Sequence, residues 1–99
     1  MTNFQKELLN EFEKIANEKK LKFVVEKDWA NCGSIYLMDN FKCIAEGSFD
    51  FQTRYANISF ESKLDNANNV GSSYIEYNKD LPQFINEYKE FVNTLERNK

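Results

Sequence analysis

The chain contains no histidine, and this absence restricts the chemistry that its side chains can perform. Histidine is the commonest general base in enzymes and the usual activator of a serine or cysteine nucleophile. The paired carboxylates, such as Glu11 and Glu13, fall on helix positions that we expect to face solvent. The three glycines are isolated, so the sequence has no glycine-rich loop for a phosphate. The sequence therefore predicts a protein that is not an enzyme.

Metal ligands are also scarce. Cys32 and Cys43 do not form a C-x-x-C pair, and without histidine a metal site would need carboxylates that the spacing does not supply. Residues 65–76 match an EF-hand loop at three positions, but Val70 stands where that motif requires glycine. The sequence predicts no metal and no cofactor.

Long apolar runs are missing as well. The first residues include Glu7 and lack the apolar segment of a signal peptide, and no stretch has the length of a membrane span. We expect a cytoplasmic protein that does not bind membranes, with both cysteines as reduced thiols.

The net charge of −3 is spread along the chain without a basic stripe, so the sequence argues against duplex nucleic acid as a partner. The acidic residues are also too sparse for a protein that mimics a nucleic-acid backbone. Residues 47–51, GSFDF, alternate aromatics as in the RNP1 strand of RNA-recognition domains. Glu46 and Asp50, however, place acidic groups where that strand needs basic or neutral ones.

Aromatic residues are abundant, at 15% of the 99 residues, and each supplies a large buried area. A chain of this length predicts a single domain over residues 1–99. Asparagine is the most frequent uncharged polar residue, which we interpret as the signature of an AT-rich genome and hence of a bacterial or phage origin.

The spacing of apolar residues predicts a helix at each end of the chain. The first covers residues 3–19, where Thr2 and Gln5 have the form of a capping box. The second begins after Asp80, a good N-cap, with Pro82 in its first turn. The apolar faces are Phe4, Leu8, Phe12, Ile15 and Ala16 in the first helix and Phe84, Ile85, Tyr88, Phe91, Val92 and Leu95 in the second.

Between the helices the apolar period changes to two, which indicates strands. The predicted strands cover residues 21–26, 34–38, 41–51, 54–63 and 74–77, with turns at 28–33 and 39–40 and a loop at 65–71. A single antiparallel sheet can bury the apolar faces of both helices. The sequence therefore predicts an α+β fold, a two-layer sandwich of helix, about five antiparallel strands and helix, with both helices on one face.

This alternation assigns the strand residues to two faces. The face toward the helices is predicted to hold Leu21, Phe23, Val25, Ile35, Leu37, Phe41, Cys43, Phe49, Ile58, Phe60 and Ile75. Gly47 would mark a bulge or a close approach of a helix. The opposite face would be about half apolar, which is more than solvent contact requires.

A surface of this kind favours a non-enzymatic protein-binding module of the inhibitor, immunity or adaptor type. The predicted partner-binding residues are Tyr36, Met38, Ile44, Tyr55, Tyr74 and Trp29. Trp29 has two interpretations, as a plug at the end of the core or as an exposed anchor. Alternative hypotheses are a binder of a small ligand or single-stranded nucleic acid that uses the same aromatics, and a structural subunit that self-associates as a homodimer.

Overall fold

The computed structural model describes residues 3–29, 31–52, 55–64, 69–76 and 79–95, without the side chains of Asn3, Phe4, Trp29, Ser72 and Ser73. Within these residues the chain forms two helices and five strands. They are α1 (Asn3–Glu18), β1 (Lys22–Trp29), β2 (Cys32–Asp39), β3 (Lys42–Phe51), β4 (Tyr55–Ser62), β5 (Asn69–Glu76) and α2 (Leu81–Thr94).

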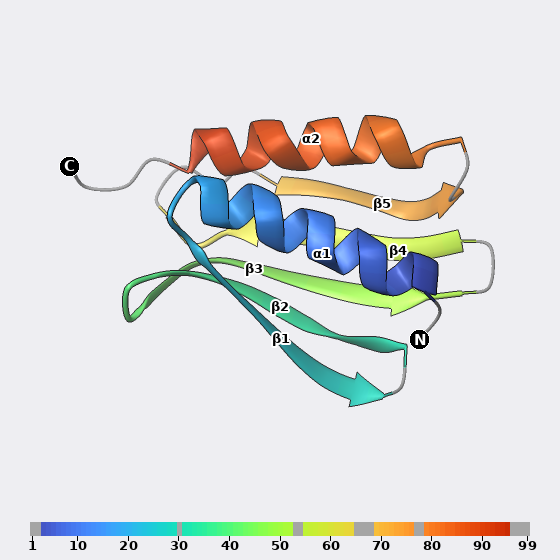
Figure 1. Cartoon of the computed structure of the whole chain (residues 1–99), viewed down its shortest axis with the longest axis horizontal. Coiled ribbons are helices and arrows are strands. Elements are labelled where there is room, and N and C mark those ends of the chain that lie inside the picture. The colour runs from blue at the N-terminus through green and yellow to red at the C-terminus, as the bar shows by residue number, and fades with distance from the viewer. Residues whose placement is uncertain (1–2, 30, 53–54, 65–68, 77–78, 96–99) are drawn as a thin grey trace.

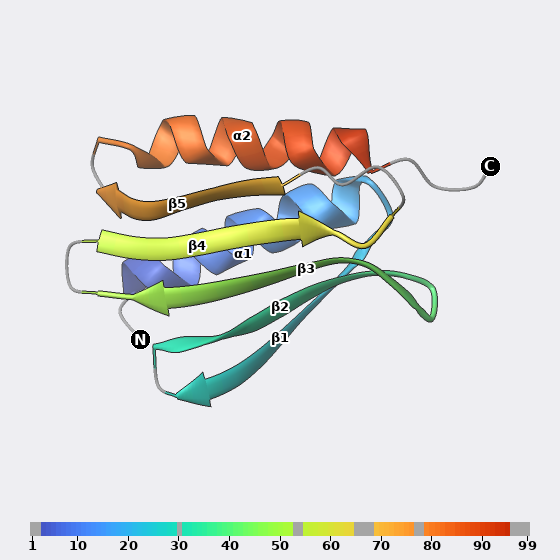
Figure 2. The ribbon, with the colours of Figure 1, turned by 180° about the vertical axis from the view of Figure 1, so that it is seen from behind.

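The strands form one antiparallel sheet in which the spatial order β1-β2-β3-β4-β5 follows the chain. In Figure 1, α1 crosses in front of the sheet and α2 runs along β5. From behind, the strands lie in front of α1, and none of the described residues forms a helix on that side (Figure 2). The predicted α+β sandwich with both helices on one face is confirmed. We call the uncovered side the open face.

The core lies between the helices and the sheet, and Phe60 of β4 is central to it. Its ring centroid is 5.8 Å from that of Phe12, 4.9 Å from that of Tyr88 and 6.0 Å from that of Phe91. The buried Tyr88 hydroxyl donates a hydrogen bond to the carbonyl oxygen of Phe12 at 3.0 Å. Aromatic packing and this bond therefore join α2, α1 and the sheet.

The predicted helix caps take other contacts. Asp80 precedes α2, but its side chain makes no capping hydrogen bond and instead accepts one from the Glu76 N–H at 2.9 Å. Asp80 thus ties the start of α2 to the end of β5. Thr2 lies outside the described residues, and the buried Gln5 donates from Nε2 to the carbonyl oxygen of Gln52 at 3.5 Å.

Three strands, β1, β2 and β5, extend into segments that we predicted as turn or loop. β1 continues to Trp29, which pairs with Cys32 at the start of β2, with an irregularity between Lys27 and Trp29. β5 begins at Asn69 and pairs with β4, although asparagine and glycine are poor strand formers. Hydrogen bonding to a neighbouring strand outweighs local preference in these segments.

A β-bulge in β3 changes the side chains that face the core. Leu37 pairs with Ala45 and Met38 with Cys43, so Ile44 is an extra residue, and Ile44 and Ala45 are only 1% and 0% exposed. The prediction that placed Ile44 on the open face is therefore wrong.

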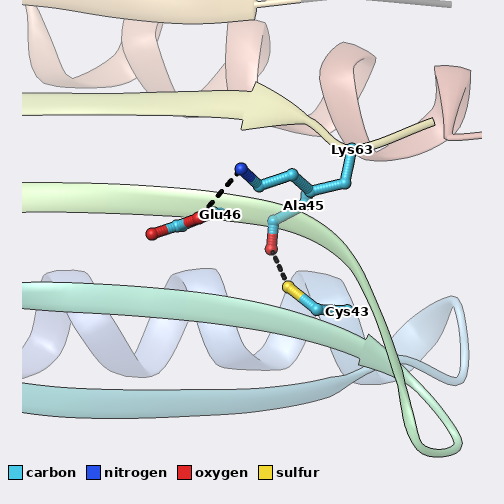
Figure 3. Close-up of polar contacts among 4 residues, drawn as sticks. All are labelled: Cys43, Ala45, Glu46 and Lys63. Atoms are coloured by element: carbon cyan, nitrogen blue, oxygen red, sulfur yellow. Dashed lines mark hydrogen bonds and ion pairs between the residues drawn. The ribbon is translucent and has the colours of Figure 1, made fainter. Parts of the chain in front are cut away.

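The same bulge shifts the alternation on the other side of Ile44. Cys43, predicted in the core, is half-buried, and its Sγ donates to the carbonyl oxygen of Ala45 at 3.2 Å (Figure 3). Phe41, also predicted in the core, lies in the turn after Asn40 and is fully exposed. Asn40 has a φ of 57°, as two-residue hairpin turns require at their first position.

Gly47 has a packing role that differs from both predictions. It lies within the regular part of β3, opposite Phe60, whose ring occupies the space where a Cβ would stand. A Cβ built on Gly47 would lie 2.6 Å from Cδ1 of Phe60. The missing side chain therefore lets the central aromatic ring lie directly on the sheet.

Candidate functional site

A row of small polar residues crosses the middle of the open face. Ser34 pairs with Ser48, Ser48 with Ser59, and Ser59 with Gly71, so one residue from each of β2, β3, β4 and β5 stands in line. We call these four residues the serine row. The hydroxyls of Ser48 and Ser59 lie 3.3 Å apart and hydrogen-bond to each other.

The small side chains of the serine row leave the open face hollow. A groove of about 680 Å³ extends over this row and over the neighbouring residues Asp28, Cys32, Asp50, Asn57 and Tyr74. We call it the open-face groove. Its lining comes from every strand of the sheet, from Asp28 on β1 to Tyr74 on β5.

The charged side chains of this face are mostly acidic. The alternation along each strand and the pairing of neighbouring strands identify the carboxylates and lysines that lie on the open face. The carboxylates are Glu26, Asp28, Glu46, Asp50, Glu61 and Glu76, and the lysines are Lys22, Lys63 and Lys79, whose Nζ lies 3.5 Å from Oε2 of Glu76. The open face therefore attracts cations and repels anions.

One end of the face is partly neutralised. Lys63, just after β4, places its Nζ 3.1 Å from Oε2 of Glu46 (Figure 3). The hydrogen bond from Lys63 to Glu46, with the charges of Glu46 and Glu61, raises the pKa of Lys63 above its usual value. Both side chains of the pair are over two-fifths exposed, so the pair adds little to stability. Its consequence is local, because it offsets the charge of Glu46.

Of the residues predicted to bind a partner, Tyr55 and Tyr74 come together. Their rings meet edge to face with centroids 5.3 Å apart, and the residues are 36% and 63% exposed. Such a pair is a rigid, partly apolar surface that can pack against another protein. Tyr74 also lines the open-face groove.

Tyr36 and Met38 lie apart from that pair. Both are half-buried on β2, where Tyr36 pairs with Val24 on one side and Glu46 on the other. The carboxylates on β3 and β4 and the serine row separate them from Tyr55 and Tyr74. These four residues, which we predicted to bind a partner, thus form two separate groups on the open face.

The remaining predicted site residues do not join either group. Ile44 lies in the core, as described above, and the side chain of Trp29 lies outside the described part of the chain. Because Ile44 turns inward and serines and carboxylates fill the centre, the open face is less apolar than we predicted.

The serines and Asp50 were absent from the predicted site, although the sequence carries a signal for them. Each serine of the row stands between two residues that face the core, as in Gly33-Ser34-Ile35 and Ile58-Ser59-Phe60. This repeated triplet indicates a small polar position on the outward face of three strands. Only the pairing of the strands aligns the three.

Among the residues that the structure describes, no group of three or more cysteines and carboxylates could hold a metal ion. Cys32, predicted in a turn, is the first residue of β2, and it lines the open-face groove as a half-buried free thiol. Asn69 and Glu76, which matched the calcium-loop pattern, lie in β5, and Asp65 is not described. No helix in the described part is long and apolar enough to cross a membrane.

Comparisons with models of protein families, with curated proteins and with solved structures found no match to this chain. Its function must therefore be argued from the geometry and charge of its own surfaces.

Proposed function

We propose that this protein is a non-enzymatic protein-binding module that acts through the open face of its sheet. The observation that supports this proposal best is the open-face groove, which crosses all the strands and has the exposed Tyr55–Tyr74 pair at one end. Hollow sheet surfaces with exposed tyrosines suit protein contacts, because tyrosine supplies a large contact area with little loss of side-chain freedom.

Single-stranded nucleic acid is a poorer candidate for the same surface. Proteins that bind single strands combine stacking aromatics with a positively charged groove. Here Asp28 and Asp50 line the groove, and Glu61 stands beside it on β4, so phosphates would be repelled. The tyrosine pair alone does not offset that repulsion.

Self-association through this face is disfavoured for a similar reason. A two-fold dimer places the same surface patch of both copies in contact. Two open faces would then bring carboxylate against carboxylate, and like charges at an interface cost several kcal/mol. We therefore propose a different protein as the partner. The inhibitor or adaptor role, the bacterial or phage origin and the cytoplasmic location remain predictions from the sequence.

The test uses the purified chain as bait in an extract of its native host. We expect the wild-type chain to retain a protein that the double variant Tyr55→Ala/Tyr74→Ala loses, because the variant removes both exposed rings. Phe41→Ala is the matched control, since it removes an exposed aromatic ring from the β2–β3 turn, away from the groove. Circular dichroism should show all three chains folded.

Retention of the same protein by the double variant would contradict the proposed site. Sedimentation of the bait alone should give a monomer at tens of micromolar, and a dimer that the double variant abolishes would favour self-association instead. Raising the salt concentration distinguishes a protein partner from single-stranded nucleic acid, because affinity for nucleic acid falls steeply with salt.

A further inference from the structure

Two carboxylates line the open-face groove from the strands on either side of β2, Asp28 from β1 and Asp50 from β3. Cys32 on β2 pairs with Asp50 on β3, and on its other side it meets the end of β1, where Asp28 also lines the groove. The backbones that carry Asp28 and Asp50 are therefore two strand spacings apart, or about 10 Å. One cationic group above Cys32 could contact both carboxylates.

The charge of this carboxylate pair is not offset within the described part of the chain. No ion pair joins a described lysine to Asp28 or Asp50, whereas Glu46 at the other end of the face has Lys63. Asp50 accepts a hydrogen bond from Nε2 of Gln52 at 3.2 Å, which brings no charge. The Glu46–Lys63 pair lies outside the groove, whose lining contains the carboxylates Asp28 and Asp50 and no lysine.

A second, independent observation points to a missing hydrogen-bond donor in the same groove. Oδ1 of Asn57, the residue that pairs with Asp50, is buried and has no hydrogen-bond partner among the described residues. A buried acceptor without a donor costs about 1–3 kcal/mol. A turn of the Asn57 side chain would bring this oxygen into the groove, where a bound donor would recover the cost.

The length of the groove limits the shape of its occupant. Five strands at about 4.8 Å spacing give about 19 Å from edge to edge, which an extended peptide of about six residues covers. The serine row supplies hydroxyls that can bond to peptide groups, and its small side chains leave space for a backbone.

We propose that the groove binds a short extended segment of the partner protein, and that this segment places an arginine side chain between Asp28 and Asp50. The inference rests on the proposed function and specifies the chemistry of the partner. Arginine fits better than lysine, because its planar guanidinium presents several N–H donors that can bond to two carboxylates and to Asn57 at once.

The experiment titrates the ¹⁵N-labelled full chain with hexa-arginine, hexa-lysine and hexa-serine. We expect hexa-arginine to shift the amide signals of Asp28, Cys32, Asp50 and Asn57, with weaker shifts from hexa-lysine and none from hexa-serine. The double variant Asp28→Asn/Asp50→Asn, which keeps shape and removes charge, should lose at least tenfold in affinity. The control variant Glu11→Gln/Glu90→Gln changes exposed helix carboxylates and should bind like the wild type.

Two results of the titration would overturn the inference. One is the absence of shifts in the groove with hexa-arginine. The other is an equal loss of affinity in the control variant, which would indicate general attraction of a polycation to an acidic protein.

The bait experiment separates this inference from the proposed function. Loss of the captured partner in Asp28→Asn/Asp50→Asn supports the arginine-binding groove. If that variant retains the partner while the tyrosine variant loses it, the arginine inference is wrong and the proposed function stands.

Discussion

The two faces of the sheet are built from alternate residues of the same strands, yet they differ in kind. Ser59 and Phe60 are neighbours on β4: Phe60 lies in the aromatic core, and Ser59 lies on the floor of the open-face groove. The covered face needs large apolar side chains, because burial of apolar area is the main favourable term in folding. The open face has no such requirement, so serines and carboxylates can occupy it.

The sharpest way to test this contrast is to remove side chains from the neighbouring residues Phe60 and Ser59. Phe60→Ala should lower the free energy of unfolding by about 3–5 kcal/mol, because it leaves a cavity among rings from both helices. Ser59→Ala loses only an exposed hydroxyl contact and should cost no more than about 0.5 kcal/mol. Urea denaturation followed by circular dichroism measures both. A similar cost for the two variants would refute the division of roles.

Gly47 and Ser48 on β3 provide a second test of the difference between the covered face and the open face. Gly47→Ala should destabilise the protein by about 1–3 kcal/mol, because the new Cβ would collide with the ring of Phe60 and overpacking forces the core to shift. Its neighbour Ser48 points to the open face and provides the matched control, Ser48→Ala, with a much smaller expected change. Thermal denaturation of both variants is the measurement. If Gly47→Ala melts at the wild-type temperature, the ring does not lie on the strand as described.

A smaller effect is expected at Tyr88 of α2, whose hydroxyl is buried in the core between the helices and the sheet. Tyr88→Phe removes the hydrogen bond to Phe12 and should cost about 1 kcal/mol in unfolding free energy at neutral pH. The exposed Tyr55 makes the matched comparison, because Tyr55→Phe keeps the ring that packs on Tyr74. An equal loss in both variants would argue against a special role for the buried bond.

The same variant should alter the pH dependence of stability. Burial raises the pKa of Tyr88 above its usual value, so the folded protein keeps a proton that the unfolded chain releases near pH 10. The unfolded state then binds fewer protons, and stability falls as the pH rises above about 10. Tyr88→Phe should make this fall less steep in urea titrations, and parallel curves would contradict the assignment.

Much of the fold was predictable because its signals are local. The three-and-four spacing in α1 and α2 and the alternation in β2 and β4 identified these elements and most of the core. The candidate site was predicted less well. Tyr55 and Tyr74 were placed on the correct face. The bulge at Ile44, however, reverses the alternation of side chains around it, so that Ile44 is buried and Phe41 is exposed. A bulge depends on how two strands pair, so the sequence of one strand does not reveal it.

By itself, the sequence determined which segments become helices and strands and that one face of the sheet must be covered, because these properties follow from the period of apolar residues. Only the tertiary structure decided which residues meet on the uncovered face. The alignment of Ser34, Ser48 and Ser59, and the presence of Asp28 and Asp50 in one groove, depend on the hydrogen-bond register between strands. Register is a relation between distant parts of the chain, and a shift of one residue would turn each of these side chains to the other face.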